Sequence, residues 1–254
     1  MCSSKQQLPS NAAHGINFDV ANRSRSLKAL LLGGHGTTTD TFIFAIMFLS
    51  IYPDIMNKLR EEHDAHFSPD IYATIKELVT SPSKTNELSY TSAVIKETLR
   101  FYPVGFTIRK PPGGAKSLKW RGKEYPLFSN AMVIPCAHSS QMDPAIRKDP
   151  KMVRPERFLG SQEGETHRFA WRSFERGPRA CIAQDLAMDE LNIMPPLTAR
   201  WFDFETLVDT QNKEPRVMYT DLDMKVGDLA FQVVGMEAGP RKDMTMKVRL
   251  SGRY

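Results

Sequence analysis

The sequence predicts a mainly α-helical fold with small β-sheets, which is the α+β class. Apolar residues recur at helical spacing over residues 54–102, and prolines bound these stretches. Beyond Pro103 the chain breaks into short β-like runs separated by Gly and Pro pairs, a pattern typical of small antiparallel sheets. The 254 residues are 41% hydrophobic and 25% charged, which is ordinary for a globular protein and excludes disorder, collagen and coiled coil.

The first predicted element covers residues 27–52 and is interrupted by the segment GGHGTTTDT. Two interpretations stay open: one long helix with a polar middle, or a strand, a Gly-rich loop and a helix. Gly33, Gly34 and Gly36 would together cost a continuous helix about 3 kcal/mol, so such a helix needs a functional reason. The second interpretation is a nucleotide-binding arrangement, but it lacks the Lys and the third Gly of the known phosphate-binding motifs.

The next helix is predicted over residues 54–67, with Asp54 as its N-cap. Within it, Glu62, His63 and His66 have the spacing of half a metal site. No further ligand has matching spacing, so we expect these residues to form a solvated helix face.

A helix over residues 89–102 follows, with Ser89 or Thr91 as its cap and Pro103 as its stop. The remaining elements are expected in this order: a small antiparallel sheet over 103–149, loops over 150–180, a helix from Cys181 to Pro195, and β-hairpins over 199–250.

The domain organisation is predicted to be a polar, flexible segment over 1–26 followed by one domain over 27–254. The net charge of +5 comes from basic and acidic residues that alternate along the chain, so we expect no nucleic-acid partner. Three cysteines without a CxxC pair indicate a reducing compartment. The chain has no signal peptide and no run of 18 apolar residues, so membrane association is not expected to be encoded in it.

The most specific motif is SFERGPRACIAQDLAMDEL, residues 173–191. A single cysteine, Cys181, follows Gly and Pro positions that permit a tight turn and precedes an amphipathic helix. Arg176 and Arg179 flank it, and both cationic side chains and a helix N-terminus favour the thiolate, which is the form that binds metal. A small buried cysteine would be the ordinary alternative, but this surrounding pattern favours a functional thiol.

Phe174, Gly177, Arg179 and Cys181, with a small residue at Ala183, resemble the haem-binding loop of the cytochrome P-450 family of haem-thiolate monooxygenases. The resemblance implies haem b as cofactor, with Cys181 as the axial ligand of its iron. It also implies that Phe174, Gly177 and Arg179 take part in cofactor binding. The fold implied is the C-terminal portion of the cytochrome P-450 fold.

Similar residues elsewhere agree with this resemblance. Glu97 and Arg100 in KETLR would alone be only an i, i+3 surface pair. In the family they join the position of Arg157 in a buried charge network that supports the haem loop. Arg109 in FTIRK, like Arg179, matches a position whose guanidinium pairs with a haem propionate.

The resemblance also gives the glycine-rich segment a reason. In the family a long helix crosses the distal face of the haem, and a threonine relays protons to bound oxygen. That residue corresponds to Thr37, with Thr38 beside it, and both are candidate catalytic residues. An acidic residue usually precedes the threonine, whereas this chain has Gly36, which puts normal proton delivery in doubt.

The implied function is insertion of one oxygen atom from O2 into a small organic molecule. The motif style is similar to filamentous-fungal members of secondary metabolism. Electrons would come from NADPH through a partner reductase. The resemblance covers about the C-terminal half of a family member, so the alternative is a truncated, inactive fragment. The family's expected location is the endoplasmic reticulum membrane, but this chain carries no anchor of that kind.

Overall fold

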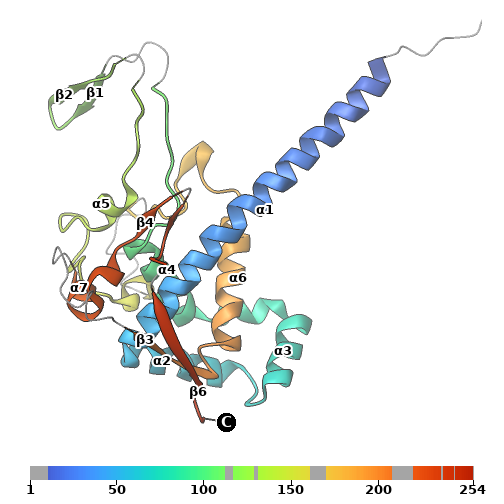
Figure 1. Cartoon of the computed structure of the whole chain (residues 1–254), viewed down its shortest axis with the longest axis vertical. Helices are drawn as coiled ribbons and strands as arrows, with labels where there is room; N and C mark the ends of the chain where they lie inside the picture. The colour runs from blue at the N-terminus through green and yellow to red at the C-terminus, as the bar shows by residue number, and fades with distance from the viewer. Residues whose placement is uncertain are drawn as a thin grey trace, which may run out of the picture. The chain divides into compact units, whose positions relative to one another are not determined.

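The computed structural model describes residues 11–111, 117–128, 131–160, 170–207, 220–235, 237–242 and 244–253. The chain divides into two units, Met1–Gly36 and Thr37–Tyr254. Helix α1 (Asn11–Ile51) supplies the described part of the first unit and is also the first helix of the second (Figure 1).

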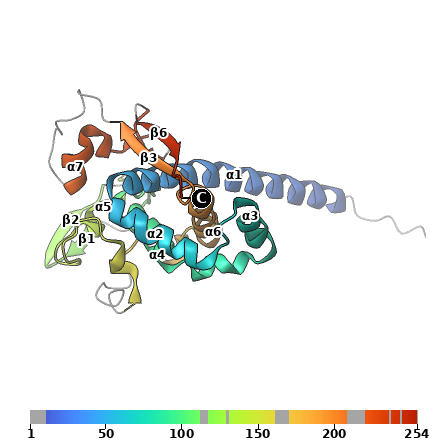
Figure 2. The same cartoon turned by 90° about the horizontal axis from the view of Figure 1, so that it is seen from below.

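The other helices all belong to the second unit. They are α2 (Pro53–His66), α3 (Ile71–Thr80), α4 (Ser89–Phe101), α5 (Ala137–Gln141), α6 (Gln184–Leu197) and α7 (Asp221–Val226), with short 3-10 helices η1 (Pro82–Glu87), η2 (Pro155–Phe158), η4 (Gly177–Arg179) and η6 (Gly227–Ala230). Helix α4 packs against α2, α5, α6 and η2, so it joins the helical elements of this unit (Figure 2).

Helix α1 runs unbroken through the segment GGHGTTTDT. The strand, loop and helix interpretation is therefore wrong, and the nucleotide-binding arrangement fails with it. From Phe44 to Leu49 every residue is buried, and this tertiary burial stabilises a helix whose glycines disfavour it. The helix begins at Asn11, so residues 11–26, expected to be flexible, are helical, and residues 1–10 lie outside the described part.

Two helix starts differ from the prediction. Asp54 lies in the first turn of α2 and does not cap it. Helix α4 begins at Ser89 without a side-chain cap of its own. The Glu62 carboxylate from α2 instead accepts the backbone N–H groups of Tyr90 and Thr91, at 2.6 and 2.8 Å. Glu62 thereby satisfies donors that a helix N-terminus leaves open.

The expectation of a solvated face around His63 is also wrong. His63 is fully buried, and its Nε2 lies 2.8 Å from the Thr91 hydroxyl. Burial, with the nearby Arg200, lowers the pKa of His63 to about 3, so the ring is neutral. His63 therefore joins α2 to α4 as a structural residue.

Within the described residues, the strands form three antiparallel pairs. They are β1 (Ser117–Trp120) with β2 (Lys123–Pro126), β3 (Phe202–Leu207) with β6 (Thr245–Leu250), and β4 (Val233–Val234) with β5 (Ala238–Gly239). A small antiparallel sheet within 103–149 and β-pairing after residue 199 agree with the prediction. Helix α7 was not predicted there, although Thr220 and Asp223 form a capping box at its start.

The main buried cluster lies among α1, α4, α6 and α7. Tyr102 stacks on Phe44 with 4.0 Å between ring centroids and 9° between ring planes. Among the described residues no single helix has the length and apolarity to cross a membrane. Only Asn22–Ile51 and Pro53–His66 taken together, bent by 110°, meet both criteria.

Candidate functional site

Cys181 closes a tight loop that starts at Phe174. The Cys181 N–H donates to the Phe174 carbonyl at 2.8 Å, which joins the two ends of the motif. Glu175 and Gly177 have φ of 57° and 76°, values that let the backbone turn between those ends. The Phe174 ring packs on the main core, whereas the Cys181 thiol is exposed and free. The loop thus presents an exposed thiol at one end, while Phe174 anchors its other end in the core.

Hydrogen bonds tie the start of the loop to α4. The Trp171 indole N–H donates to the Lys96 carbonyl at 3.1 Å, and the Ser173 hydroxyl donates to the Leu99 carbonyl at 3.0 Å. The Trp171 ring also meets the Phe174 ring edge-on, with centroids 5.8 Å apart. The position of the thiol therefore depends on α4.

Glu97, Arg100 and Arg157 come together as one buried network. Arg100 donates to the Glu97 carboxylate through Nε at 2.7 Å and Nη2 at 2.8 Å, and Arg157 Nε lies 3.2 Å from the same carboxylate. The Glu97 and Arg100 side chains are fully buried, and that of Arg157 is 4% exposed. Burial lowers the pKa of Arg157 and the Glu97 charge opposes this, so the carboxylate offsets part of the burial cost.

The remaining donors of the two arginines bind backbone carbonyls. Arg100 donates to Gln141, Pro150 and Met152, and Arg157 donates to the carbonyls of residues 148, 149 and 152. The network therefore shapes the irregular segment that leads from α5 to η2. The charged groups of the network thus have hydrogen-bond acceptors or donors around them, which lowers the cost of burying their charge.

Gln141 connects this network to the cysteine loop, and sequence reasoning missed it. Its side chain is fully buried. Its amide donates to the Arg100 carbonyl at 3.3 Å, and its Oε1 accepts from the Arg172 N–H at 3.4 Å and from the Ser173 hydroxyl at 3.3 Å. No local sequence signal marks Gln141, because its partners lie 31 to 41 positions away.

The segment that carries Arg109 is also attached to the loop. The Thr107 hydroxyl donates to the Glu175 carboxylate at 3.2 Å. Arg109 pairs with Val133 through two backbone hydrogen bonds of 2.8 Å, which fixes its main chain. Its guanidinium donates to the Ile108 carbonyl at 3.3 Å, and Arg179 is exposed. Both cations remain available to an anionic ligand.

Thr37 and Thr38 lie in α1 at the start of the second unit. Thr38 is 6% exposed and Thr37 is half-buried. The Thr41 hydroxyl donates to the Thr37 carbonyl at 2.8 Å, one turn back along the helix.

A cavity of about 960 Å³ lies one helical turn beyond Thr37. It is bounded by α1 and by the β4–β5 hairpin, and its lining includes Asp40, Ile43, Phe231 and Met244. Burial, with the nearby Glu237, raises the pKa of Asp40. The cavity therefore combines apolar walls with a carboxylate at its helical side.

The donor set of the cysteine loop fits haem better than a metal ion held by protein alone. Haem needs one axial protein ligand and cations for its propionates, and the loop offers an exposed thiol with Arg109 and Arg179 on connected segments. Over the described part of the chain, no three or more His, Cys, Asp and Glu side chains gather into a metal site. The residues present thus fit a haem held by a thiolate.

Comparisons with known proteins agree with this geometry. A family model described as Cytochrome P450 matches residues 4–225. The chain is 28% identical to cytochrome P450 monooxygenase acrF of Aspergillus aculeatus, covering 96% of this chain and 53% of that protein. It is 34% identical to cytochrome P450 monooxygenase PC-23 of Penicillium crustosum, covering 64% and 79%.

Solved structures give the same fold. A crystal structure of a cytochrome P450, CYP102L1, aligns with a TM-score of 0.66 at 22% identity, over 87% of this chain and 44% of that one. The chain spans about half the length of the first curated relative it matches. Its α+β fold therefore corresponds to part of a larger architecture.

Proposed function

This chain belongs to the cytochrome P450 family, and from that premise we propose that it supplies the haem-thiolate site of a monooxygenase. The reaction is insertion of one oxygen atom from O2 into a small organic molecule. The observation that carries the proposal is the exposed Cys181 thiol at the end of a hydrogen-bonded loop. A haem bound there would supply the oxygen activation, and the Cys181 thiolate would tune it by donating electron density to the iron.

The residues of the cysteine loop hold the cofactor in this proposal. Cys181 ligates the iron, while Phe174 and Gly177 shape the loop behind it. Arg109 and Arg179 pair with the propionates, a task suited to guanidinium groups, which bind carboxylates through two parallel N–H donors. Glu97, Arg100 and Arg157 act through the loop and support its position.

Proton delivery is assigned to the α1 threonines. The Thr37 hydroxyl, with Thr38 beside it, would hold a proton donor or an ordered water. Gly36 provides no carboxylate at the preceding position, so turnover is expected to be slow or poorly coupled to substrate oxidation. The apolar walls of the α1 and β4–β5 cavity favour an apolar or partly polar substrate.

Electron supply requires a reductase, and NADPH is the proposed source. The bifunctional cytochrome P450/NADPH–P450 reductase 1 of Bacillus subtilis is 30% identical to this chain over 86% of it. Fungal relatives from Aspergillus and Penicillium support a role in fungal secondary metabolism. The endoplasmic reticulum membrane, where eukaryotic family members reside, is the proposed location of the complete protein.

The test is the absorption spectrum of purified, dithionite-reduced protein with carbon monoxide, after expression with a haem precursor. The proposal expects a strongly red-shifted Soret band that Cys181→Ser abolishes, because a serine oxygen replaces the soft thiolate poorly. Cys136→Ser is the matched control, since Cys136 is also exposed and free. A haem-free protein, or an unshifted band, would support the alternative of an inactive fragment.

A further inference from the structure

The cavity between α1 and the β4–β5 hairpin has two carboxylates beside apolar residues. Its lining includes Asp40 of α1 and Glu237, which lies in the turn between β4 and β5. Ile43, Phe231 and Met244 add aliphatic, aromatic and thioether surface. The Asp40 and Glu237 side chains are both half-buried. A molecule in this cavity therefore meets negative charge and apolar surface together.

Among the described residues, no ion pair or hydrogen bond neutralises either carboxylate. Burial and the negative charge of Glu237 raise the pKa of Asp40, because both effects oppose its charged form. Of the two basic residues in the lining, Arg241 lies 3.7 Å from the Asp228 carboxylate, and Lys242 is exposed. A positive charge inside the cavity would therefore stabilise the Asp40 carboxylate.

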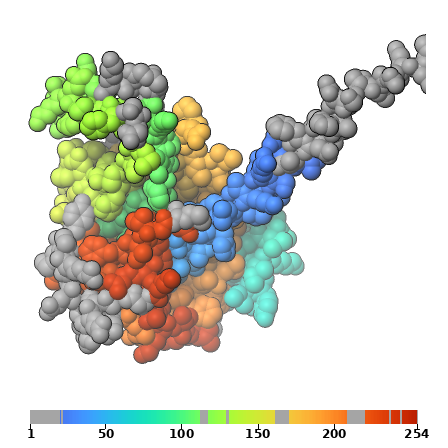
Figure 3. Space-filling view, turned by 45° about the horizontal axis from the view of Figure 1, so that its top comes forward, coloured from blue at the N-terminus to red at the C-terminus, as the bar shows by residue number. Residues whose placement is uncertain are grey.

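The Asp40 carboxylate rests directly against the hairpin. A Cβ atom at Gly239 would lie 2.5 Å from Asp40 Oδ2 and 3.0 Å from its Cγ. Any side chain at that position would displace the carboxylate, so the approach of α1 to β5 requires Gly239. Figure 3 shows the red C-terminal segments of the second unit beside the blue of α1.

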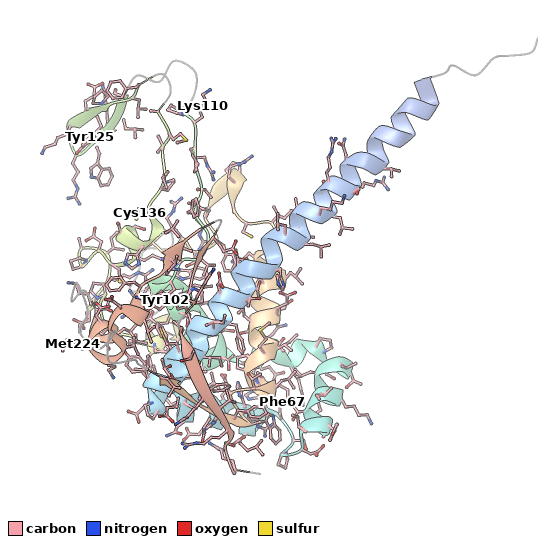
Figure 4. The ribbon with its side chains drawn as sticks, in the orientation of Figure 1. Phe67, Tyr102, Lys110, Tyr125, Cys136 and Met224 are labelled. Carbon is pink, nitrogen blue, oxygen red and sulfur yellow. The ribbon has the colours of Figure 1, made fainter. Side chains whose placement is uncertain are left out.

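Both walls of the cavity are fixed to the end of α4. The Tyr102 ring, labelled in Figure 4, stacks on Phe44, which lies one turn along α1 from Asp40. The Ala238 N–H on the hairpin donates to the Val104 carbonyl at 2.9 Å. The two walls thus share one anchor, and a cavity held in this way pays little to order itself around a ligand.

We infer that the substrate carries a positively charged nitrogen and that Asp40 and Glu237 select for it. This inference rests on the monooxygenase function proposed above and adds a substrate class to it. The two carboxylates attract the cation, the Phe231 ring offers it a cation–π contact, and the apolar lining receives the rest of the molecule. Asp40 follows Thr37 by three positions, so the two side chains lie on one face of α1. The cation is therefore held beside the residue to which proton delivery is assigned.

Meta-substituted phenols of nearly equal shape test the charge preference. They carry a trimethylammonium, a tert-butyl or a sulfonate group, which are all tetrahedral and differ in charge. A quaternary ammonium neither titrates nor ligates iron, so its binding reports the cavity itself. Isothermal titration calorimetry of the purified full chain should show the ammonium binding about tenfold more tightly than the sulfonate, because the carboxylates attract one and repel the other.

Acid-to-amide variants identify the groups that set this preference. Asp40→Asn should weaken ammonium binding about tenfold and change tert-butyl binding less than about twofold, because the charge is lost while the shape is kept. Glu237→Gln, on the opposite wall, should act in the same direction. Asp189→Asn is the matched control, since Asp189 is exposed on α6 and lies outside the cavity lining. Circular dichroism checks that each variant keeps the helical content of the wild type.

Tighter binding of the sulfonate than of the ammonium would overturn the inference, because the basic residues of the lining would then set the preference. Equal losses in Asp40→Asn and Asp189→Asn would also overturn it, since the effect would be one of net charge alone. The carbon monoxide spectrum of the same preparation tests the proposed function separately. Haem binding without charge selection removes only the substrate class. Charge selection without haem removes the monooxygenase role and leaves the cation preference of the cavity standing.

Discussion

Glu97→Gln is expected to destabilise the protein severely, because Glu97 is the single carboxylate of the buried network. Its oxygens accept from Arg100, from Arg157 and from the Arg154 backbone N–H at 2.7 Å. Glutamine keeps the shape but removes the charge and turns one acceptor into a donor. Two guanidinium groups that are 0% and 4% exposed then lose their common counter-charge.

Removing one partner of a buried charge pair costs about 3–5 kcal/mol. With a urea dependence of about 3 kcal/mol per M, the unfolding midpoint should fall by roughly 1–2 M. Circular dichroism at 222 nm follows the transition, since α4 and the helices around it unfold together. Haem loading of the variant should fall as well, because the cysteine loop is bonded to α4.

Glu61→Gln is the control, since Glu61 is exposed in the third turn of the neighbouring helix α2. Exposed substitutions of this kind change stability by about 0.5 kcal/mol at most. A Glu97→Gln midpoint that matches the Glu61→Gln midpoint would refute the reasoning, because the network would then hold no uncompensated charge. A loss that Arg100→Lys reproduces would show that the bidentate geometry contributes in addition to the charge.

Two further perturbations probe the links beside this network. Gln141→Leu should cost about 1–3 kcal/mol in urea unfolding and lower haem loading, because the Arg172 N–H loses its acceptor and the buried Arg100 carbonyl loses a donor; unchanged loading would separate Gln141 from the site. His63 has a folded-state pKa of about 3 against about 6.5 unfolded, so its contribution is complete above pH 6.5 and is lost as the pH falls toward 3. Between pH 7 and 5 the wild type should lose about 2 kcal/mol more than His63→Gln.

The sequence predicted those parts of the fold that depend on local patterns. Apolar spacing located α2 and α4, and Gly and Pro pairs located the antiparallel pairs. Local sequence could not show whether the residues of α1 form one continuous helix. Their glycines cost such a helix about 3 kcal/mol, and the burial of Phe44 to Leu49 that compensates for this comes from tertiary packing. Helix α7 had a local sequence signal, the capping box of Thr220 and Asp223. This signal was missed because the residues around it have a strand-like pattern.

The candidate site divides in the same way. The contacts among Glu97, Arg100 and Arg157 were predicted because a family pattern ties residue types to spacing, and Cys181 is proposed as the ligand from the same pattern. Glu62, His63 and Gln141 were missed or misjudged because their roles depend on partners 28 to 41 positions away. A buried His and a solvated His look alike in a sequence, and only packing distinguishes them.

The outward direction of the Cys181 thiol follows from how the loop is anchored at each end. Phe174 is held inward by the core and by the Trp171 ring, so the carbonyl that accepts from Cys181 is fixed in place. The intervening residues reverse the chain through positive φ at Glu175 and Gly177. Since the backbone N–H of Cys181 must face Phe174, its side chain faces away from the core. The geometry of the Cys181 thiol therefore depends on α4 and on Gln141, to which the start of the loop is hydrogen-bonded.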